Sequence, residues 1–228
     1  GEHFSRTLDE LIERRVQFLT DYQDARYAER YRALVQRVRK RESEVTASSK
    51  LTEAVARYYA KLLAYKDEYE VARLHTSGAL EQKVGGMFEG DYKLVFHLAP
   101  PLVNKPDPDT GEPRKSSYGP WMMGAFRVLA KMRRLRGTAL DIFGRTAERR
   151  MERQLIADYE TLIEELLASL GAHNHAIAVE IASIPEQIRG YGHVKDRHLR
   201  AAKEKEAKLV AAFRAATATA PSAERVAA

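Results

Sequence analysis

Apolar residues recur at helical spacing along most of the chain, and this periodicity constrains the fold more than any other feature. In the N-terminal part, one helical face collects Leu8, Leu11, Ile12, Val16, Leu19, Tyr22, Tyr27, Tyr31, Leu34, Val35 and Val38. A second stripe alternates steps of four and three and comprises Leu51, Val55, Tyr58, Leu62, Tyr65, Tyr69 and Ala72. The stripes predict two long amphipathic helices that pack as an antiparallel hairpin, the first with a break near Asp21.

The middle of the chain has the period of a β-strand instead. Apolar side chains alternate with their neighbours at Tyr92, Leu94, Phe96 and Leu98. The stretch 104–114 contains three prolines and predicts a long turn between two extended arms. The predicted fold class is therefore mainly α, a multi-helix domain with a small antiparallel β-hairpin inserted near residues 91–118.

Helical signals resume after the hairpin. Apolar faces predict helices that begin near Met122, Thr146 and Asn174, and a last helix through Phe213. Thr146 is placed to cap its helix, as Thr7 caps the first one, and Gly137 occupies the position of a glycine that ends a helix. We expect one helical domain over residues 1–215, which the resemblance given below makes an accessory domain, and a disordered tail over residues 216–228, which are rich in Ala, Thr and Ser.

Composition excludes several classes of site. The chain has no cysteine, so it holds no disulfide, no cysteine-ligated cluster and no thiol nucleophile. The net charge is +6, but acidic residues are interleaved with the basic ones, which argues against a nucleic-acid footprint. No apolar run reaches the roughly 18–20 residues needed to cross a bilayer, and the first residues do not resemble a secretion signal. We expect a cytoplasmic protein without a membrane partner.

A turn with two glycines is the best candidate for a functional contact. The segment 184–189 leads into Gly190-Tyr191-Gly192-His193-Val194-Lys195. Glycine loses more backbone freedom on folding than any other residue, so two of them around an aromatic indicate a turn whose shape matters. The residues alone do not identify what this turn contacts; the resemblance given below implies that Arg189, Tyr191, His193 and Lys195 contact a ligand or another domain.

Other charged clusters are weaker candidates. Arg133 and Arg134, with Arg136 and the arginines at 145–153, are placed to meet a polyanion such as a nucleotide phosphate, or to pair with nearby acids. Lys66, Asp67 and Glu68 lie between two tyrosines and form either a charged helix surface or an interface. The histidines lack metal-ligand spacing, so we predict no metal site and no catalytic residue in this segment.

Five ordered blocks resemble fused indolepyruvate ferredoxin oxidoreductases. The blocks are Ala64–Leu74, Phe96–Pro101, Asp107–Lys115, Tyr118–Met122 with Trp121, and Pro185–Lys195. The resemblance runs from about Thr7 to Phe213 and is to the C-terminal region of those enzymes, a domain of unknown function. It implies a parent that oxidatively decarboxylates arylpyruvates to aryl-acetyl-coenzyme A, uses thiamine diphosphate, Mg²⁺ and iron–sulfur clusters, and passes electrons to ferredoxin.

The resemblance also implies that catalysis takes place elsewhere in the parent. This segment lacks the Gly-Asp-Gly…Asn signature of a thiamine diphosphate site, since Tyr92 follows Gly90-Asp91. We therefore expect a non-catalytic domain that holds no cofactor, packs against other domains, joins protomers of a homo-oligomer, or shapes ligand access. Trp121 belongs with the predicted contacts. The alternatives are a stand-alone basic module that binds nucleic acid and an oligomerisation unit that uses the Leu51–Ala72 seam.

Overall fold

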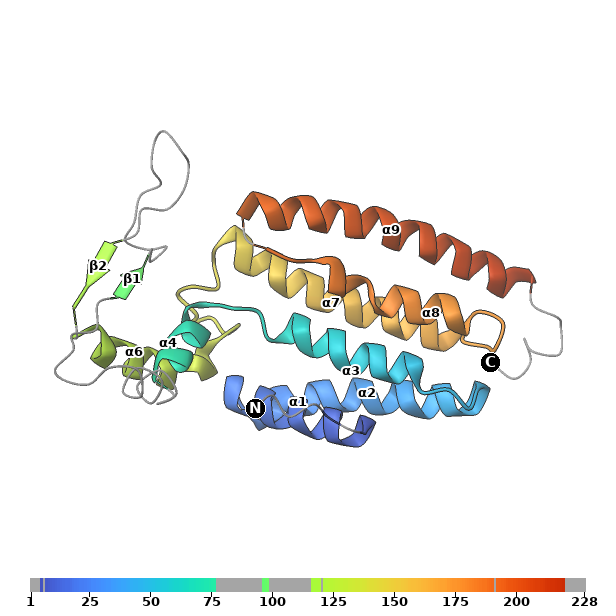
Figure 1. Cartoon of the computed structure of the whole chain (residues 1–228), viewed down its shortest axis with the longest axis horizontal. Helices are drawn as coiled ribbons and strands as arrows, with labels where there is room; N and C mark the ends of the chain where they lie inside the picture. Colours follow the sequence, from blue (N-terminus) through green and yellow to red (C-terminus); the bar gives the residue numbers. More distant parts are fainter. Residues whose placement is uncertain are drawn as a thin grey trace. The chain divides into compact units, whose positions relative to one another are not determined.

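The computed structural model describes residues 5, 7–76, 96–98, 116–119, 121–190 and 192–219, which are mainly helical (Figure 1). Eight α-helices lie within this part of the chain, so the predicted mainly α class is confirmed. The chain divides into two compact units. Unit 1 comprises Gly1–Tyr65 and Arg145–Ala228, and unit 2 comprises Lys66–Gly144. The single domain predicted over residues 1–215 stays a prediction.

Unit 1 is a helical bundle built from both ends of the chain. Its helices are α1 (Leu8–Tyr22), α2 (Ala25–Val45), α3 (Lys50–Leu63), α7 (Ala147–Ala168), α8 (His175–Ala182) and α9 (Gly192–Thr219), with the 3₁₀ turn η2 (Ile184–Gln187) before α9. Helix α3 packs against α1, α2, α7 and α8, and α9 packs against α8 and η2 (Figure 1). Helix α9 continues to Thr219, into the stretch predicted as a tail, and residues 220–228 lie outside the described residues.

Side-chain caps explain where three of these helices begin. The side chains of Thr7, Asp24 and Thr146 each accept a hydrogen bond from the backbone N–H three residues further on. The first turn of a helix leaves such N–H groups without a partner in the helix, and these side chains supply one. The caps predicted at Thr7 and Thr146 are confirmed. Asp24 caps the start of α2, just after the predicted break near Asp21.

Helix α3 takes its cap from a neighbouring helix. Its own N-cap residue, Ser49, makes no side-chain hydrogen bond to the helix. Instead the carboxylate of Glu42 on α2, which is 1% exposed, accepts hydrogen bonds of 2.8 Å from the N–H groups of Leu51 and Thr52. The hydroxyl of Thr52 donates to the same carboxylate at 2.5 Å, and Nε2 of His175 lies 2.7 Å from it. Glu42 thereby joins α2, α3 and α8.

Three stacked tyrosines occupy the core of unit 1. The ring centroids of Tyr31 and Tyr59, and of Tyr59 and Tyr159, are 5.9 Å apart. The hydroxyls of Tyr31 and Tyr159 donate to main-chain carbonyls at 2.9 Å, and that of Tyr59 donates to Glu160, which Arg30 also binds through two nitrogens. Burial raises the pKa of all three phenols, so they stay neutral while they connect α2, α3 and α7.

The second predicted helix is broken in two, so the continuous Leu51–Ala72 seam is wrong. Helix α3 ends at Leu63, and the chain becomes helical again at α4 (Glu68–Thr76). The side chain of Asp67 accepts a 2.9 Å hydrogen bond from the N–H of Glu70 and caps α4. A strong N-cap residue favours the start of a new helix over the continuation of the preceding one. The heptad pattern considers only apolar spacing and therefore does not show where such a cap interrupts the helix.

Unit 2 has a small apolar core of its own. Helix α6 (Met122–Lys131), followed by the 3₁₀ turn η1 (Met132–Leu135), lies beside α4 (Figure 1). The core consists of Ala72 from α4 and Met122, Met123, Phe126 and Ala130 from α6. Gly137, the predicted helix-ending glycine, has a φ of +75°.

Two short strands also belong to unit 2. They are β1 (Phe96–Leu98) and β2 (Ser116–Tyr118), which pair antiparallel with Phe96 opposite Tyr118. The turn predicted between them lies outside the described residues, so the complete hairpin near residues 91–118 stays a prediction. Among the helices that the structure describes, none combines the length and the apolar character needed to cross a bilayer.

Candidate functional site

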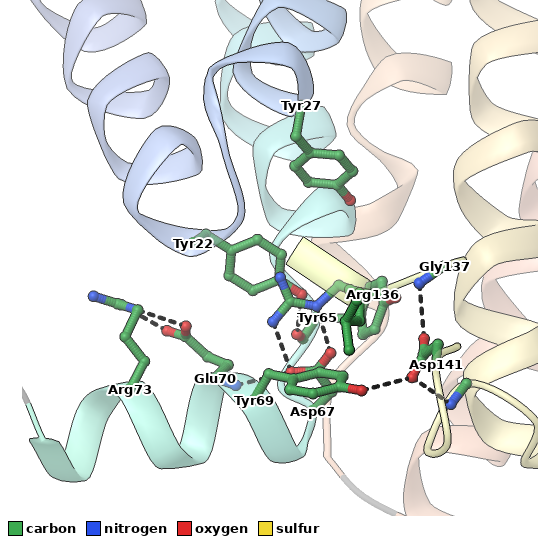
Figure 2. A network of polar contacts seen from close by, with 12 residues as sticks. Tyr22, Tyr27, Tyr65, Asp67, Tyr69, Glu70, Arg73, Arg136, Gly137 and Asp141 are labelled. Carbon is green, nitrogen blue, oxygen red and sulfur yellow. Dashed lines mark hydrogen bonds and ion pairs between the residues drawn. The ribbon is translucent and has the colours of Figure 1, made fainter. Parts of the chain in front are cut away.

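A buried polar network in unit 2 joins the start of α4 to the loop 136–144 (Figure 2). Arg136 forms an ion pair with Asp67, with Nε at 2.5 Å from one carboxylate oxygen and a terminal nitrogen at 2.8 Å from the other. The two side chains are only 2% and 3% exposed. The guanidinium also lies 5.6 Å from the ring centroid of Tyr69. A bidentate ion pair that is so well shielded from water fixes the start of α4 relative to the loop 136–144.

Asp141 is the second centre of this network. Its carboxylate accepts hydrogen bonds from the N–H groups of Gly137 and Gly144, at 2.7 and 2.9 Å, and so closes the loop on itself. The hydroxyl of Tyr69 on α4 donates to the same carboxylate at 3.2 Å, and its ring meets Phe143 edge-on. Burial, reinforced by the negative charge of Asp141, raises the pKa of Tyr69, so this phenol remains a donor at neutral pH.

The hydrogen bonds of this network hold the loop 136–144 against α4. Both oxygens of Asp67 and both oxygens of Asp141 accept hydrogen bonds from groups of the same unit. A second pair follows on α4, where Arg73 binds both oxygens of Glu70 at 2.8 Å. A general acid or base must reach the proton it moves, and Asp67 and Asp141 are each only 3% exposed.

The glycine turn in unit 1 has a backbone that explains its sequence. Gly190 and Gly192 have φ values of +90° and +53°, a region that disfavours other residues. A Cβ on Gly190 would also lie 2.8 Å from a methyl group of Val194. The Lys61 ammonium on α3 donates to the carbonyls just before this turn, those of Pro185, Glu186 and Ile188, at 2.7, 3.2 and 3.1 Å. Burial, with repulsion from Arg189, lowers the pKa of Lys61.

The predicted contact residues on this turn differ in their exposure and in their partners. Arg189 is exposed and binds Glu186 three residues earlier. His193 is exposed in the first turn of α9. The Lys195 ammonium donates to the carboxylate of Glu152 on α7, and both side chains are mostly buried. Tyr191 lies outside the described residues.

The other predicted contacts lie in unit 2 and do not form one group. Lys66, Trp121 and Arg134 are exposed, and Glu68 and Arg133 are half-buried. Asp67 is the member that the structure brings into the buried network, with Arg136 as its partner. The ten predicted residues are thus divided between the two units.

Sequence reasoning missed the residues that hold these sites together. Asp141 and Lys61 were not singled out, and Arg136 was treated as one of several surface arginines. An available signal was Asp141 itself, a lone acid between Gly137 and Gly144 in a segment without apolar periodicity. Lys61 carries no such signal, because it lies at an ordinary polar position of α3. Within the described part of the chain, no three His, Cys, Asp or Glu side chains are grouped to hold a metal ion.

Comparison with known proteins identifies a family and no further relative. A family of unknown function, DUF6537, matches residues 8–208. The searches of curated proteins and of solved structures found no significant match. The matched region begins at the first residue of α1 and ends inside α9, and therefore includes both the buried network and the glycine turn. The chain belongs to the DUF6537 family of unknown function.

Proposed function

We propose that this chain is an accessory domain of an indolepyruvate-type 2-oxoacid:ferredoxin oxidoreductase. The parent would oxidatively decarboxylate arylpyruvates to aryl-acetyl-coenzyme A, with ferredoxin as electron acceptor. Thiamine diphosphate, Mg²⁺ and the iron–sulfur clusters would bind elsewhere in the parent. The observation that carries the proposal is the resemblance of the ordered blocks from Ala64 to Lys195, all of which fall within the family region.

The contacts of the charged residues support a role in packing and assembly. Asp67 is paired with Arg136, Lys195 with Glu152, and Lys61 with three carbonyls. Each of these charges contributes to the folded structure of its own unit, and the Asp67–Arg136 and Lys195–Glu152 pairs are shielded from water. Catalysis needs acids, bases or nucleophiles within reach of a substrate, so this pattern favours a scaffold over a reaction centre.

The test is to compare the complete product of the gene with the 228-residue chain. We expect the complete product to reduce ferredoxin with indolepyruvate in a reaction that requires coenzyme A, and the isolated chain to show no turnover. A complete product that is inactive with arylpyruvates, or turnover by the isolated chain, would contradict the proposal.

Two substitutions test whether the glycine turn touches a ligand. His193→Ala and Arg189→Ala, both at exposed positions of the turn, should raise KM for coenzyme A or the arylpyruvate in the complete enzyme if the turn shapes ligand access. Lys205→Ala, an exposed position further along α9, is the control. Unchanged kinetics and unchanged assembly would leave the turn with a structural role alone.

The structure bears differently on the two alternative functions, oligomerisation and nucleic-acid binding. Oligomerisation through the Leu51–Ala72 seam loses its basis, because the seam is divided between α3 and α4, and Leu51 and Val55 are buried in unit 1. Binding of nucleic acid by the basic chain is tested by retention on DNA, which phosphate contacts would make strongly salt-dependent.

A further inference from the structure

Unit 2 carries an unusual set of exposed apolar side chains. Among the described residues, the large apolar side chains that stay exposed are Leu74, Trp121, Val128, Leu140 and Ile142, at 44, 66, 61, 69 and 52%. All five lie in unit 2. Single exposed apolar residues are normal on any protein, but a set confined to the smaller unit indicates a surface that another molecule covers.

Helix α6 contributes part of this surface. Its inner face is occupied by core residues such as Met122 and Phe126. Trp121 and Val128 are seven positions apart, so they share the opposite, outer side of the helix. Arg127 and Lys131 are also exposed and flank this side. The outer side of α6 thus combines apolar side chains with cations.

The loop 136–144 contributes two more of these side chains, and Leu74 on α4 is the fifth. Leu140 and Ile142 flank Asp141, whose carboxylate is bound within the unit by Gly137, Gly144 and Tyr69. The polar residue is therefore held inside, and its two apolar neighbours are exposed. A loop fixed in this way loses little conformational entropy on binding, because its shape is set in advance.

The charge of this region specifies the partner. Between Trp121 and Gly144 the chain has five cations and one acid, Asp141. Asp141 and Arg136 are buried in the network, and the exposed charges are Arg127, Lys131 and Arg134. An exposed surface that is apolar and positively charged is complementary to one that is apolar and acidic.

We propose that unit 2 docks, through the outer side of α6 and the loop 136–144, onto an acidic protein surface with apolar pockets. This inference rests on the proposed function in one respect, since the partner is the remainder of the parent polypeptide. A second copy of the chain is a poor fit, because a two-fold contact would place these cations against themselves. A membrane is a poor fit because the outer side of α6 alternates apolar residues with cations, whereas interfacial helices present a broad apolar face.

The experiment measures binding of the full 228-residue chain to the separately expressed remainder of the gene product. Two double variants probe the surface: Leu140→Ser with Ile142→Ser, and Arg127→Glu with Lys131→Glu. The matched control is Lys205→Glu with Lys208→Glu on the exposed side of α9. We expect each surface variant to weaken binding by about tenfold or more, the control to stay within about twofold, and wild-type binding to weaken with salt. The substituted side chains are exposed, so the thermal midpoints should not change.

The outcomes separate this inference from the proposed function. Binding that the surface variants do not affect overturns the docking surface and leaves the proposed function standing. Weakened binding, together with a complete gene product that lacks oxidoreductase activity, supports the surface and removes the proposed function. Wild-type chain that does not bind the remainder overturns the docking surface, and the activity of the complete gene product then decides the proposed function.

Three further results would also overturn the docking surface. Lower thermal midpoints for the serine variant would show that Leu140 and Ile142 pack within the chain itself. Binding of wild-type chain to phosphatidylglycerol vesicles, or to duplex DNA, that the charge variant loses would assign the surface to a different partner.

Discussion

Replacement of Glu42 by alanine should destabilise unit 1 strongly. The carboxylate is 1% exposed and accepts hydrogen bonds from the N–H groups of Leu51 and Thr52 and from the Thr52 hydroxyl, and it lies against His175. Glu42→Ala leaves these buried groups without their acceptor, and each unsatisfied donor costs about 1–3 kcal/mol. Because water and side-chain movement recover part of that cost, we expect a loss of about 3–5 kcal/mol, as for a broken buried ion pair.

Urea denaturation followed by circular dichroism measures this loss. A domain of this size has a free energy of unfolding of about 5–15 kcal/mol, so the transition midpoint should move well below that of the wild type. Hydrogen exchange at the amides of Leu51 and Thr52 should accelerate more than exchange elsewhere in α3, because these amides lose their acceptor directly.

A matched control lies two residues away on the same helix. Glu44 is exposed and pairs with Arg41 three residues earlier, so Glu44→Ala should cost at most about 1 kcal/mol. Glu42→Gln keeps the volume and one acceptor oxygen and should fall between the two alanine variants. A Glu42→Ala protein within about 1 kcal/mol of the wild type would refute the assignment of Glu42 as the cap of α3.

Three other predictions concern the stacked tyrosines, the Arg136–Asp67 pair and the cap at Thr146. The folded-state pKa values of Tyr31, Tyr59 and Tyr159 lie above the unfolded value of about 10, so their stabilisation is complete below that pH and is lost as pH rises further; the share of tyrosinate absorbance that comes from these three of the 11 tyrosines should therefore appear together with unfolding, and not before it. Arg136→Met leaves the buried Asp67 without its partner and should lower the stability of unit 2 by about 3–5 kcal/mol, which unfolding followed by the fluorescence of the single tryptophan measures. The control is Arg134→Met at an exposed position, which should change the stability little. Thr146→Ala should cost about 1 kcal/mol in a thermal melt, and no measurable loss would show that this cap is dispensable.

The sequence predicted features that depend on near neighbours. Thr7 and Thr146 could be identified as caps because a cap and the N–H it binds lie three residues apart. Helical spacing likewise identified the faces that became the core of unit 1. In contrast, the Arg136–Asp67 pair joins residues 69 positions apart, and the Lys195–Glu152 pair joins residues 43 apart. No local pattern records such distances, so the sequence could propose the charges but not their partners.

The error at the second helix has a related cause. The stripe from Leu51 to Ala72 has an unbroken four-three rhythm, yet α3 packs in unit 1 and α4 packs in unit 2. Periodicity reports which side of a helix is apolar and gives no information about which core receives that side. Asp67 was the residue that marked the boundary, since an N-cap in the middle of an apolar stripe indicates a new helix start.

The loop 136–144 departs most clearly from the rule that apolar side chains go inside. That rule would bury Leu140 and Ile142 and expose Asp141, and the structure does the reverse. Burial of a carboxylate is costly unless hydrogen bonds compensate, and Asp141 has three of them. The compensation explains how the loop tolerates its inward acid, but it does not explain the two outward apolar side chains. Local rules fail most often where a surface is used, and a partner that covers Leu140 and Ile142 would recover the free energy that their exposure forgoes.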